Sequence, residues 1–287
     1  MSAKHLKSGI LWMALACLSF AVMAAAAKFC GKRIPVAEII LVRSFISSVV
    51  IGFLLLKTKG SFIGKNPPIL ASRGAIGFLA LTLYFWAVSK LDLGTAVMLN
   101  YTSPIFALLW ARLFIHERST AESRTAVVIS FAGVYLLSMP HFHAHGVAIA
   151  AGLLSGVLAG SVQVLIRQSH EEDSSLTIIF YFTAICTLGS VILLGLSGAV
   201  WPTRGEWLAL LVVTLTSLVG QFGLTYSLKC APVSVVTPFG YLTPIFGSLL
   251  GWLLWKESLS ELGLFGGFLI IAGGILVYRS LRSWPET

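Results

Sequence analysis

Long apolar runs separated by short polar breaks are the dominant pattern of this chain. Each run approaches the roughly 20 residues that a helix needs to cross the hydrocarbon core of a bilayer. No run alternates apolar and polar residues as the strand of a membrane barrel does, so the pattern favours helices. The runs cover residues 8–27, 37–56, 72–90, 93–115, 121–139, 146–167, 176–196, 206–228, 233–255 and 261–279. We therefore predict an all-α membrane protein with ten transmembrane helices.

The first of these runs also resembles the apolar part of a secretory signal peptide, because Lys4 and Lys7 precede it. It is longer, however, than the roughly 7–15 apolar residues of such a segment. We expect it to be retained as the first helix.

Composition excludes the soluble alternatives. Hydrophobic residues make up 57% of the 287 residues and charged residues 11%, whereas a soluble domain carries about 25% charged residues. The net charge of +9 suggests nucleic acid in a soluble protein, but no basic recognition helix or aromatic RNA-binding sheet is visible here. We expect the lipid bilayer, and not nucleic acid, as the main partner of the surface.

The positions of Lys and Arg predict the orientation. Ten spans put both termini on one side of the membrane. The predicted tails and loops of that side hold 13 Lys and Arg residues, among them Arg73 at the end of the third span. The other side holds six, while Arg43 lies inside a span. Because positively charged loops stay in the cytoplasm, we predict cytoplasmic termini and a multi-pass position in the inner (plasma) membrane.

The two halves of the chain are similar to each other. Residues 101–136 align without a gap to residues 241–276 and are identical at ten of 36 positions, including a shared Tyr-x-x-Pro-Ile-Phe and a following Glu. A half of five helices is odd in number, so the second half enters the membrane from the opposite side. We predict two inverted-topology five-helix repeats, 1–140 and 141–287, an arrangement that suits alternating access but also occurs in channels.

Several motifs then resemble those of one family, the EamA-type transporters of the drug/metabolite transporter superfamily. They are EIILVRSF at 38–45, Arg73–Gly74, TSPIFALLWARLFIHE at 102–117 and LTPIFGSLLGWLLWKE at 242–257. The resemblance covers nearly the whole chain. It implies a carrier of amino acids, nucleotide-linked compounds, cofactors or drugs, and it does not identify the cargo.

Within that superfamily, the segments 28–48 and 73–106 are also similar to a subgroup of S-adenosylmethionine carriers. An uptake or exchange carrier of that type, and a drug or amino-acid exporter, are therefore alternatives.

Arg43 is the main candidate for substrate recognition, because it lies about seven residues, or roughly 10 Å, inside the second predicted span. An ionisable group within the membrane indicates a functional site. Its guanidinium suits a carboxylate or phosphate; alternatively it reaches the interface or caps a neighbouring helix. Tyr181 is its counterpart in the second half and is also a cavity candidate.

Pro104 and Pro244 lie near the middle of the fourth and ninth spans, where each removes a backbone N–H and kinks its helix. We interpret both as kink or gating positions. Polar side chains beside the kinks are candidates to line a central cavity or, alternatively, to satisfy the kinked backbone; they are Asn100, Tyr101, Thr102, Ser103, Tyr241 and Thr243.

Gln163 and Gln221 are further cavity candidates, because an amide within a bilayer needs a partner. Small residues four apart, such as Gly152, Gly156 and Gly160, predict close helix packing. That packing is within one chain or between two, so a homodimer is one arrangement that the sequence allows.

The remaining chemistry is sparse. Glu38, Asp92, Glu117 and Glu257 map to span ends, which argues against a carboxylate proton relay. The four cysteines do not cluster, and the motif His141-x-His143-x-His145 reads as a polar loop. We predict no metal, no cofactor and no enzyme activity.

The sequence thus predicts an alternating-access carrier of a small polar metabolite, amino-acid-like, nucleotide-like or otherwise anionic or zwitterionic. A passive channel is the alternative from another class.

Overall fold

The computed structural model describes residues 3–117, 119–138, 146–170, 172–256 and 261–280, and all regular structure in these ranges is helical. His141, His143, His145 and Glu257 lie outside the described residues. The helices are α1 Ala3–Cys30, α2 Val36–Lys57, α3 Pro67–Lys90, α4 Leu93–Asn100, α5 Ser103–Phe114, α6 Ala121–Ser138, α7 Gly146–Ser169, α8 Ser175–Ser197, α9 Arg204–Cys230, α10 Val233–Val236, the 3₁₀ helix η1 Thr237–Tyr241, α11 Leu242–Trp255 and α12 Glu261–Ser280.

Eight segments of the described chain are long and apolar enough to cross a membrane, and α12 holds a shorter apolar stretch, Leu264–Leu276. Large apolar side chains cover the outside of the molecule; Leu11, Phe53 and Leu188 are each more than 60% exposed. Exposed apolar surface of this extent needs lipid around it. The prediction of an all-helical, multi-pass membrane protein is confirmed.

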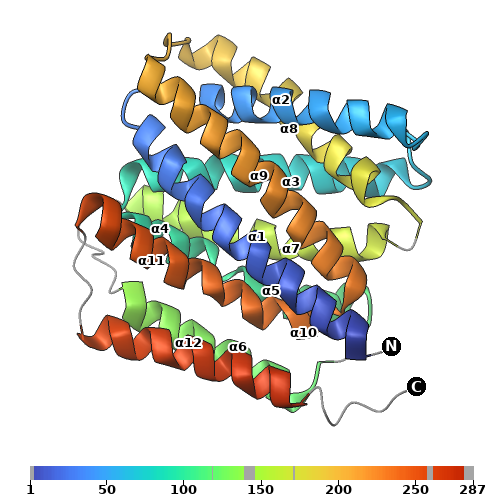
Figure 1. Cartoon of the computed structure of the whole chain (residues 1–287), viewed down its shortest axis with the longest axis vertical. Coiled ribbons are helices and arrows are strands. Elements are labelled where there is room, and N and C mark those ends of the chain that lie inside the picture. The colour runs from blue at the N-terminus through green and yellow to red at the C-terminus, as the bar shows by residue number, and fades with distance from the viewer. Residues whose placement is uncertain (1–2, 118, 139–145, 171, 257–260, 281–287) are drawn as a thin grey trace.

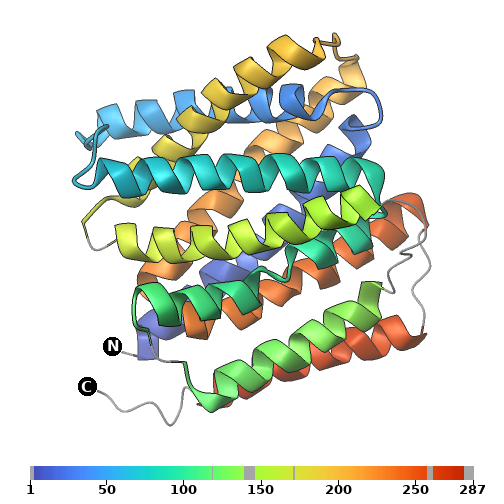
Figure 2. The same cartoon turned by 180° about the vertical axis from the view of Figure 1, so that it is seen from behind.

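The helices pair across the two halves of the chain. α1 packs on α9 and α3 on α7, while α2 packs on α8. α5 packs on α7, and α11 packs on α1. The last helices of the halves, α6 and α12, lie side by side along one edge of the molecule in both views (Figures 1 and 2). Most helices therefore find their main partner in the other half.

The fourth predicted span is broken directly before Pro104. α4 ends at Asn100 and α5 begins at Ser103, because a proline cannot donate the N–H that would continue the helix from the carbonyl of Asn100. In the second half the break is the 3₁₀ turn η1, which contains Pro238. Pro244 lies in the first turn of α11, where no N–H donor is needed, so the distortion precedes it.

Three glycines let α7 lie against the first break. A Cβ atom at Gly156 would stand 2.2 Å from Thr102 Oγ1 and 2.8 Å from the carbonyl of Leu99. Gly152 meets Leu99 and Gly160 meets the backbone of Ser103 in the same way. The prediction that these glycines form a packing seam is confirmed, and the seam fixes α7 to the broken helix.

Candidate functional site

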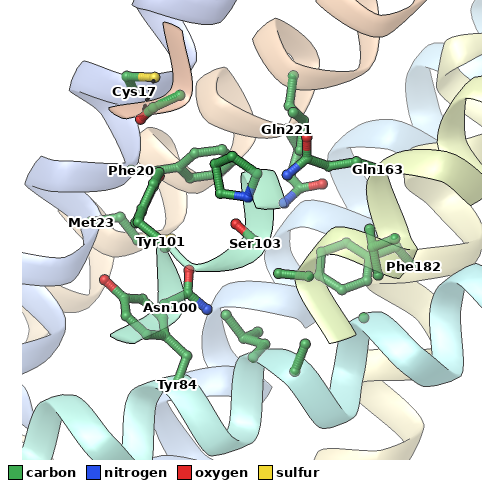
Figure 3. Close-up of a pocket in the computed structure, with 18 of the residues that line it drawn as sticks. Cys17, Phe20, Met23, Tyr84, Asn100, Tyr101, Ser103, Gln163, Phe182 and Gln221 are labelled. Carbon is green, nitrogen blue, oxygen red and sulfur yellow. Dashed lines mark hydrogen bonds between the residues drawn. The ribbon is translucent and has the colours of Figure 1, made fainter. Parts of the chain in front are cut away.

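A cavity lies at the centre of the bundle, between helices of both halves. The volume open to water inside it is about 150 Å³, which suits a small ligand. α1, α2, α3, the α4–α5 break, α7, α8, α9 and η1 all contribute to its wall. Figure 3 shows Tyr84, Asn100, Ser103, Gln163 and Gln221 converging on it from different helices. Among the residues that the structure describes, no acidic one lines the cavity.

Most of the candidates from the sequence are brought together here. Arg43, Asn100, Tyr101, Ser103, Pro104, Gln163 and Gln221 all line the cavity.

Hydrogen bonds hold the side chains of Asn100 and Tyr101 at the first break. The Asn100 amide donates to Ser155 Oγ at 2.9 Å, and the Tyr101 hydroxyl donates to Thr243 Oγ1 at 2.6 Å. These bonds join the end of α4 to α7 and the α4–α5 break to α11.

Five candidates do not belong to the described wall of the cavity: Thr102, Tyr181, Tyr241, Thr243 and Pro244. The Tyr181 hydroxyl instead donates to the carbonyl of Ile63 at 2.8 Å. Tyr241 is fully buried behind the wall, and Thr243 supports Tyr101 from outside it.

Arg43 reaches the cavity as expected. It is 1% exposed, and its Nε donates to Ser217 Oγ on α9 at 2.6 Å. Its Nη1 and Nη2 atoms are buried and have no hydrogen-bond partner among the described residues. The guanidinium lies over the ring of Phe182, 5.3 Å from the ring centre, so it does not reach out to the membrane interface.

A second buried cation was missed. Arg73 was predicted at the cytoplasmic end of the third span, and that placement is wrong: α3 begins at Pro67, so Arg73 lies well inside it and is 1% exposed. Its Nη2 donates to Gln221 Oε1 at 2.8 Å, and its guanidinium lies 4.0 Å from the centre of the Phe182 ring. Arg43 is therefore not the only intramembrane cation.

Aromatic and apolar walls were missed as well. Tyr84 and Phe182 line the cavity, as do Met13, Phe20 and Met23 of α1. Aromatic and apolar residues are expected throughout a membrane span, so no sequence signal distinguishes those that face a cavity. η1 contributes Thr237, whose hydroxyl donates to Gln163 Oε1 at 3.3 Å.

Carboxylates tie the two ends of the bundle. At the start of α9, Arg33 Nε donates to Glu206 Oε1 at 2.8 Å, and Arg33 Nη2 also bonds Glu206 Oε2. At the other end of α9, Glu117 Oε1 accepts from the backbone N–H of Ser234 at 3.0 Å, and Arg167 donates to the carbonyl of Leu228. These ties lie above and below the cavity.

His170 follows directly after α7, at the end of the bundle where Glu117 lies. Its Nε2 lies 2.9 Å from the carbonyl oxygen of Thr225, and its Nδ1 is buried without a partner among the described residues. Burial, with a smaller contribution from the nearby cations Lys229 and Arg167, lowers the pKa of His170 to about 4. The folded protein therefore holds this imidazole neutral.

We expect acid to destabilise the protein through His170. In the unfolded protein the His170 imidazole protonates near pH 6.5, so the free energy of unfolding is highest above that pH. The free energy of unfolding falls by up to about 3 kcal/mol as the pH drops toward 4. Melting temperatures of the wild type and of His170→Gln, measured from pH 7.5 to 4.5, test this. The wild type should lose its advantage over the variant on acidification; parallel curves would contradict the expectation.

Comparison with known proteins gives consistent matches along the chain. The profile of the EamA-like transporter family matches residues 7–139 and again residues 146–279. A pseudopaline exporter of Pseudomonas aeruginosa is 33% identical over 279 residues, covering 96% of this chain and 98% of the exporter. An S-adenosylmethionine uptake transporter of Rickettsia felis is 24% identical, covering 95% and 93%. A solved crystal structure at 18% identity superposes with a TM-score of 0.83 over 96% of this chain.

Proposed function

The chain belongs to the EamA-like transporter family, and on that premise we propose that it exports a small polar metabolite bearing an anionic group across the inner membrane by alternating access. The observation that carries the proposal is Arg43, a buried guanidinium at a central cavity. Two of its nitrogen atoms have no hydrogen-bond partner among the described residues, and the described lining holds no acidic residue. An intramembrane cation is costly unless it binds something. Export is the proposed direction because the 33% identical relative is named an exporter.

The proposed topology is ten spans in two inverted repeats with cytoplasmic termini. α6 and α12 have 18 and 20 residues, which at 1.5 Å per residue approaches the roughly 30 Å of a hydrocarbon core. In the two repeats, α7 is the counterpart of α1 and α9 is the counterpart of α3. The α1–α9 contact therefore corresponds to the α7–α3 contact, and both contacts are present. This equivalence supports inverted repeats. A homodimer remains a prediction.

Alternating access is proposed from the position of the breaks and ties. The α4–α5 break and η1 are irregular backbone at the cavity, where discontinuous helices bind substrates in transporters. Glu206 ties the start of α9 to Arg33, and Arg167 of α7 ties the other end of α9 through the carbonyl of Leu228. Releasing one tie while the other holds would open the cavity to one side at a time.

S-adenosylmethionine is the alternative cargo, favoured by the relatives at 24% identity. Its sulfonium is a cation, and the cavity presents buried arginines without an acidic lining residue. Like charges in a low-dielectric site repel each other. We therefore rank it below an anionic cargo.

The test is transport by everted membrane vesicles, in which an exporter accumulates its substrate. Pseudopaline and S-adenosylmethionine are the two probes. We expect saturable uptake of pseudopaline, and a loss of at least tenfold in Arg43→Ala, since a charge-assisted hydrogen bond contributes about 1.5–3 kcal/mol. Arg112→Ala, an exposed arginine at the end of α5, is the control.

Uptake that rises without saturation would favour a channel. Uptake that is equal in Arg43→Ala and wild type would remove Arg43 from the site. Preferential saturable uptake of S-adenosylmethionine would replace the proposed cargo and leave the direction of transport unchanged.

A further inference from the structure

The cavity contains two guanidinium groups at one aromatic ring. Arg43 comes from α2 and Arg73 from α3, and both lie within 5.3 Å of the centre of the Phe182 ring on α8. Each is 1% exposed. Phe182 thus holds two cations from different helices beside the same space.

Each guanidinium uses only part of its hydrogen-bonding capacity. Arg43 donates through Nε to Ser217, and Arg73 donates through Nη2 to Gln221. The nitrogens left without a partner among the described residues are Nη1 and Nη2 of Arg43 and Nε and Nη1 of Arg73. The two arginines therefore offer four buried donor atoms, two on each planar group.

The described wall supplies no negative charge to balance these cations. Neutral amides and hydroxyls are its polar groups, from residues such as Asn100, Gln163 and Thr237. The ring of Phe182 attracts a cation through its negative face, but the attraction is far weaker than that of a carboxylate. A positive charge taken out of water is costly unless an opposite charge joins it.

A glycine of α3 leaves room for the Phe182 ring and the Arg73 guanidinium. A Cβ atom at Gly77 of α3 would stand 3.0 Å from the Phe182 ring and 3.2 Å from Arg73 Nη1. Because Gly77 has no side chain, the Phe182 ring and the Arg73 guanidinium can both pack closely against α3, one turn beyond Arg73.

We propose that Arg43 and Arg73 form one site that binds two negative charges of a single substrate, so that the cargo is a dianion with its charges on oxygen. Two carboxylates, or one phosphate ester in its doubly ionised form, supply this chemistry, and each planar guanidinium can donate two parallel hydrogen bonds to either. The inference rests on the proposed function and narrows its substrate class.

Matched pairs of small anions test the proposal with the purified full-length protein at pH 8 and constant ionic strength. The probes are succinate against butyrate, glutarate against valerate, adipate against hexanoate, and methyl phosphate against dimethyl phosphate. Binding is measured from the rise of the melting temperature with probe concentration, because a ligand of the folded state raises its stability. We expect at least one dianion to bind at least tenfold more tightly than its monoanionic partner.

The phosphate pair and the carboxylate pairs distinguish the two sources of charge. Arg43→Gln and Arg73→Gln should each reduce the preference to about twofold or less, while Arg112→Gln leaves it intact. Arg73→Lys, which keeps the charge and loses the planar group, should retain part of the preference and guards against a variant that does not fold.

Equal binding of dianions and monoanions by the wild type would overturn the proposal, as would a preference that survives in both glutamine variants. These results are separable from failure of the proposed function. A protein that transports saturably but shows no dianion preference refutes only the substrate class, whereas absence of saturable transport refutes the carrier itself.

Discussion

Replacing Arg43 by methionine is expected to raise the free energy of unfolding of the ligand-free protein by about 1–4 kcal/mol while abolishing transport. The guanidinium is 1% exposed, and two of its nitrogens have no hydrogen-bond partner among the described residues. Methionine has a similar length, so it keeps the contact with Phe182 and removes the buried charge. A group retained for binding at the expense of stability is typical of functional sites.

Thermal unfolding of the purified variant gives the result directly. Arg167→Met is the matched control, because Arg167 donates to the carbonyl of Leu228 at 2.9 Å and its Nε lies 4.0 Å from Glu117. That variant should lose stability. If Arg43→Met also melts below the wild type, the arginine supports the fold and its place in a binding site becomes doubtful.

Gly156→Ala is expected to lower the free energy of unfolding by about 1–3 kcal/mol, the usual cost of forcing extra volume into a packed interior. The added methyl would stand 2.8 Å from the carbonyl of Leu99 and 3.0 Å from that of Asn100. Backbone atoms cannot move aside as a flexible side chain can, so α7 must shift away from the α4–α5 break. Because Asn100 bonds to Ser155 on α7, the cavity wall should also be disturbed.

Gly267→Ala on α12 separates this packing effect from helix propensity. No atom of another described element lies within 4 Å of a Cβ atom at Gly267. Alanine favours a helix interior over glycine by up to about 1 kcal/mol. The melting temperature should therefore rise or stay constant in Gly267→Ala and fall in Gly156→Ala. Equal shifts in the two variants would contradict the packing argument.

Apolar length predicted the helices well, because the cost of exposing a polar backbone to lipid leaves helices as the natural spanning element. Proline chemistry also predicted the break before Pro104. The break in the second half was located less well. Pro244 is conspicuous in the repeat, but Pro238 lies within the 3₁₀ turn, and it has no counterpart in the first half.

The cavity was predicted only in part, since depth and direction come from tertiary packing. Arg73 was assigned to the membrane end because the apolar run begins at residue 72, five residues after the start of α3. Those five residues correspond to about 7.5 Å along a helix. Tyr181 was chosen by its offset in the repeat, yet the next residue, Phe182, turns about 100° around the helix and faces the cavity.

If the proposed function and substrate class hold, the pair of arginines at Phe182 would also make the carrier sensitive to voltage. On the proposed function, a dianion neutralises the cavity, so the loaded carrier moves no net charge across the membrane. The empty carrier moves two positive charges. Each charge that crosses the full field of 100 mV contributes about 2.3 kcal/mol. A membrane potential that is negative inside would therefore draw the empty cavity back toward the cytoplasm, where an exporter collects its next substrate.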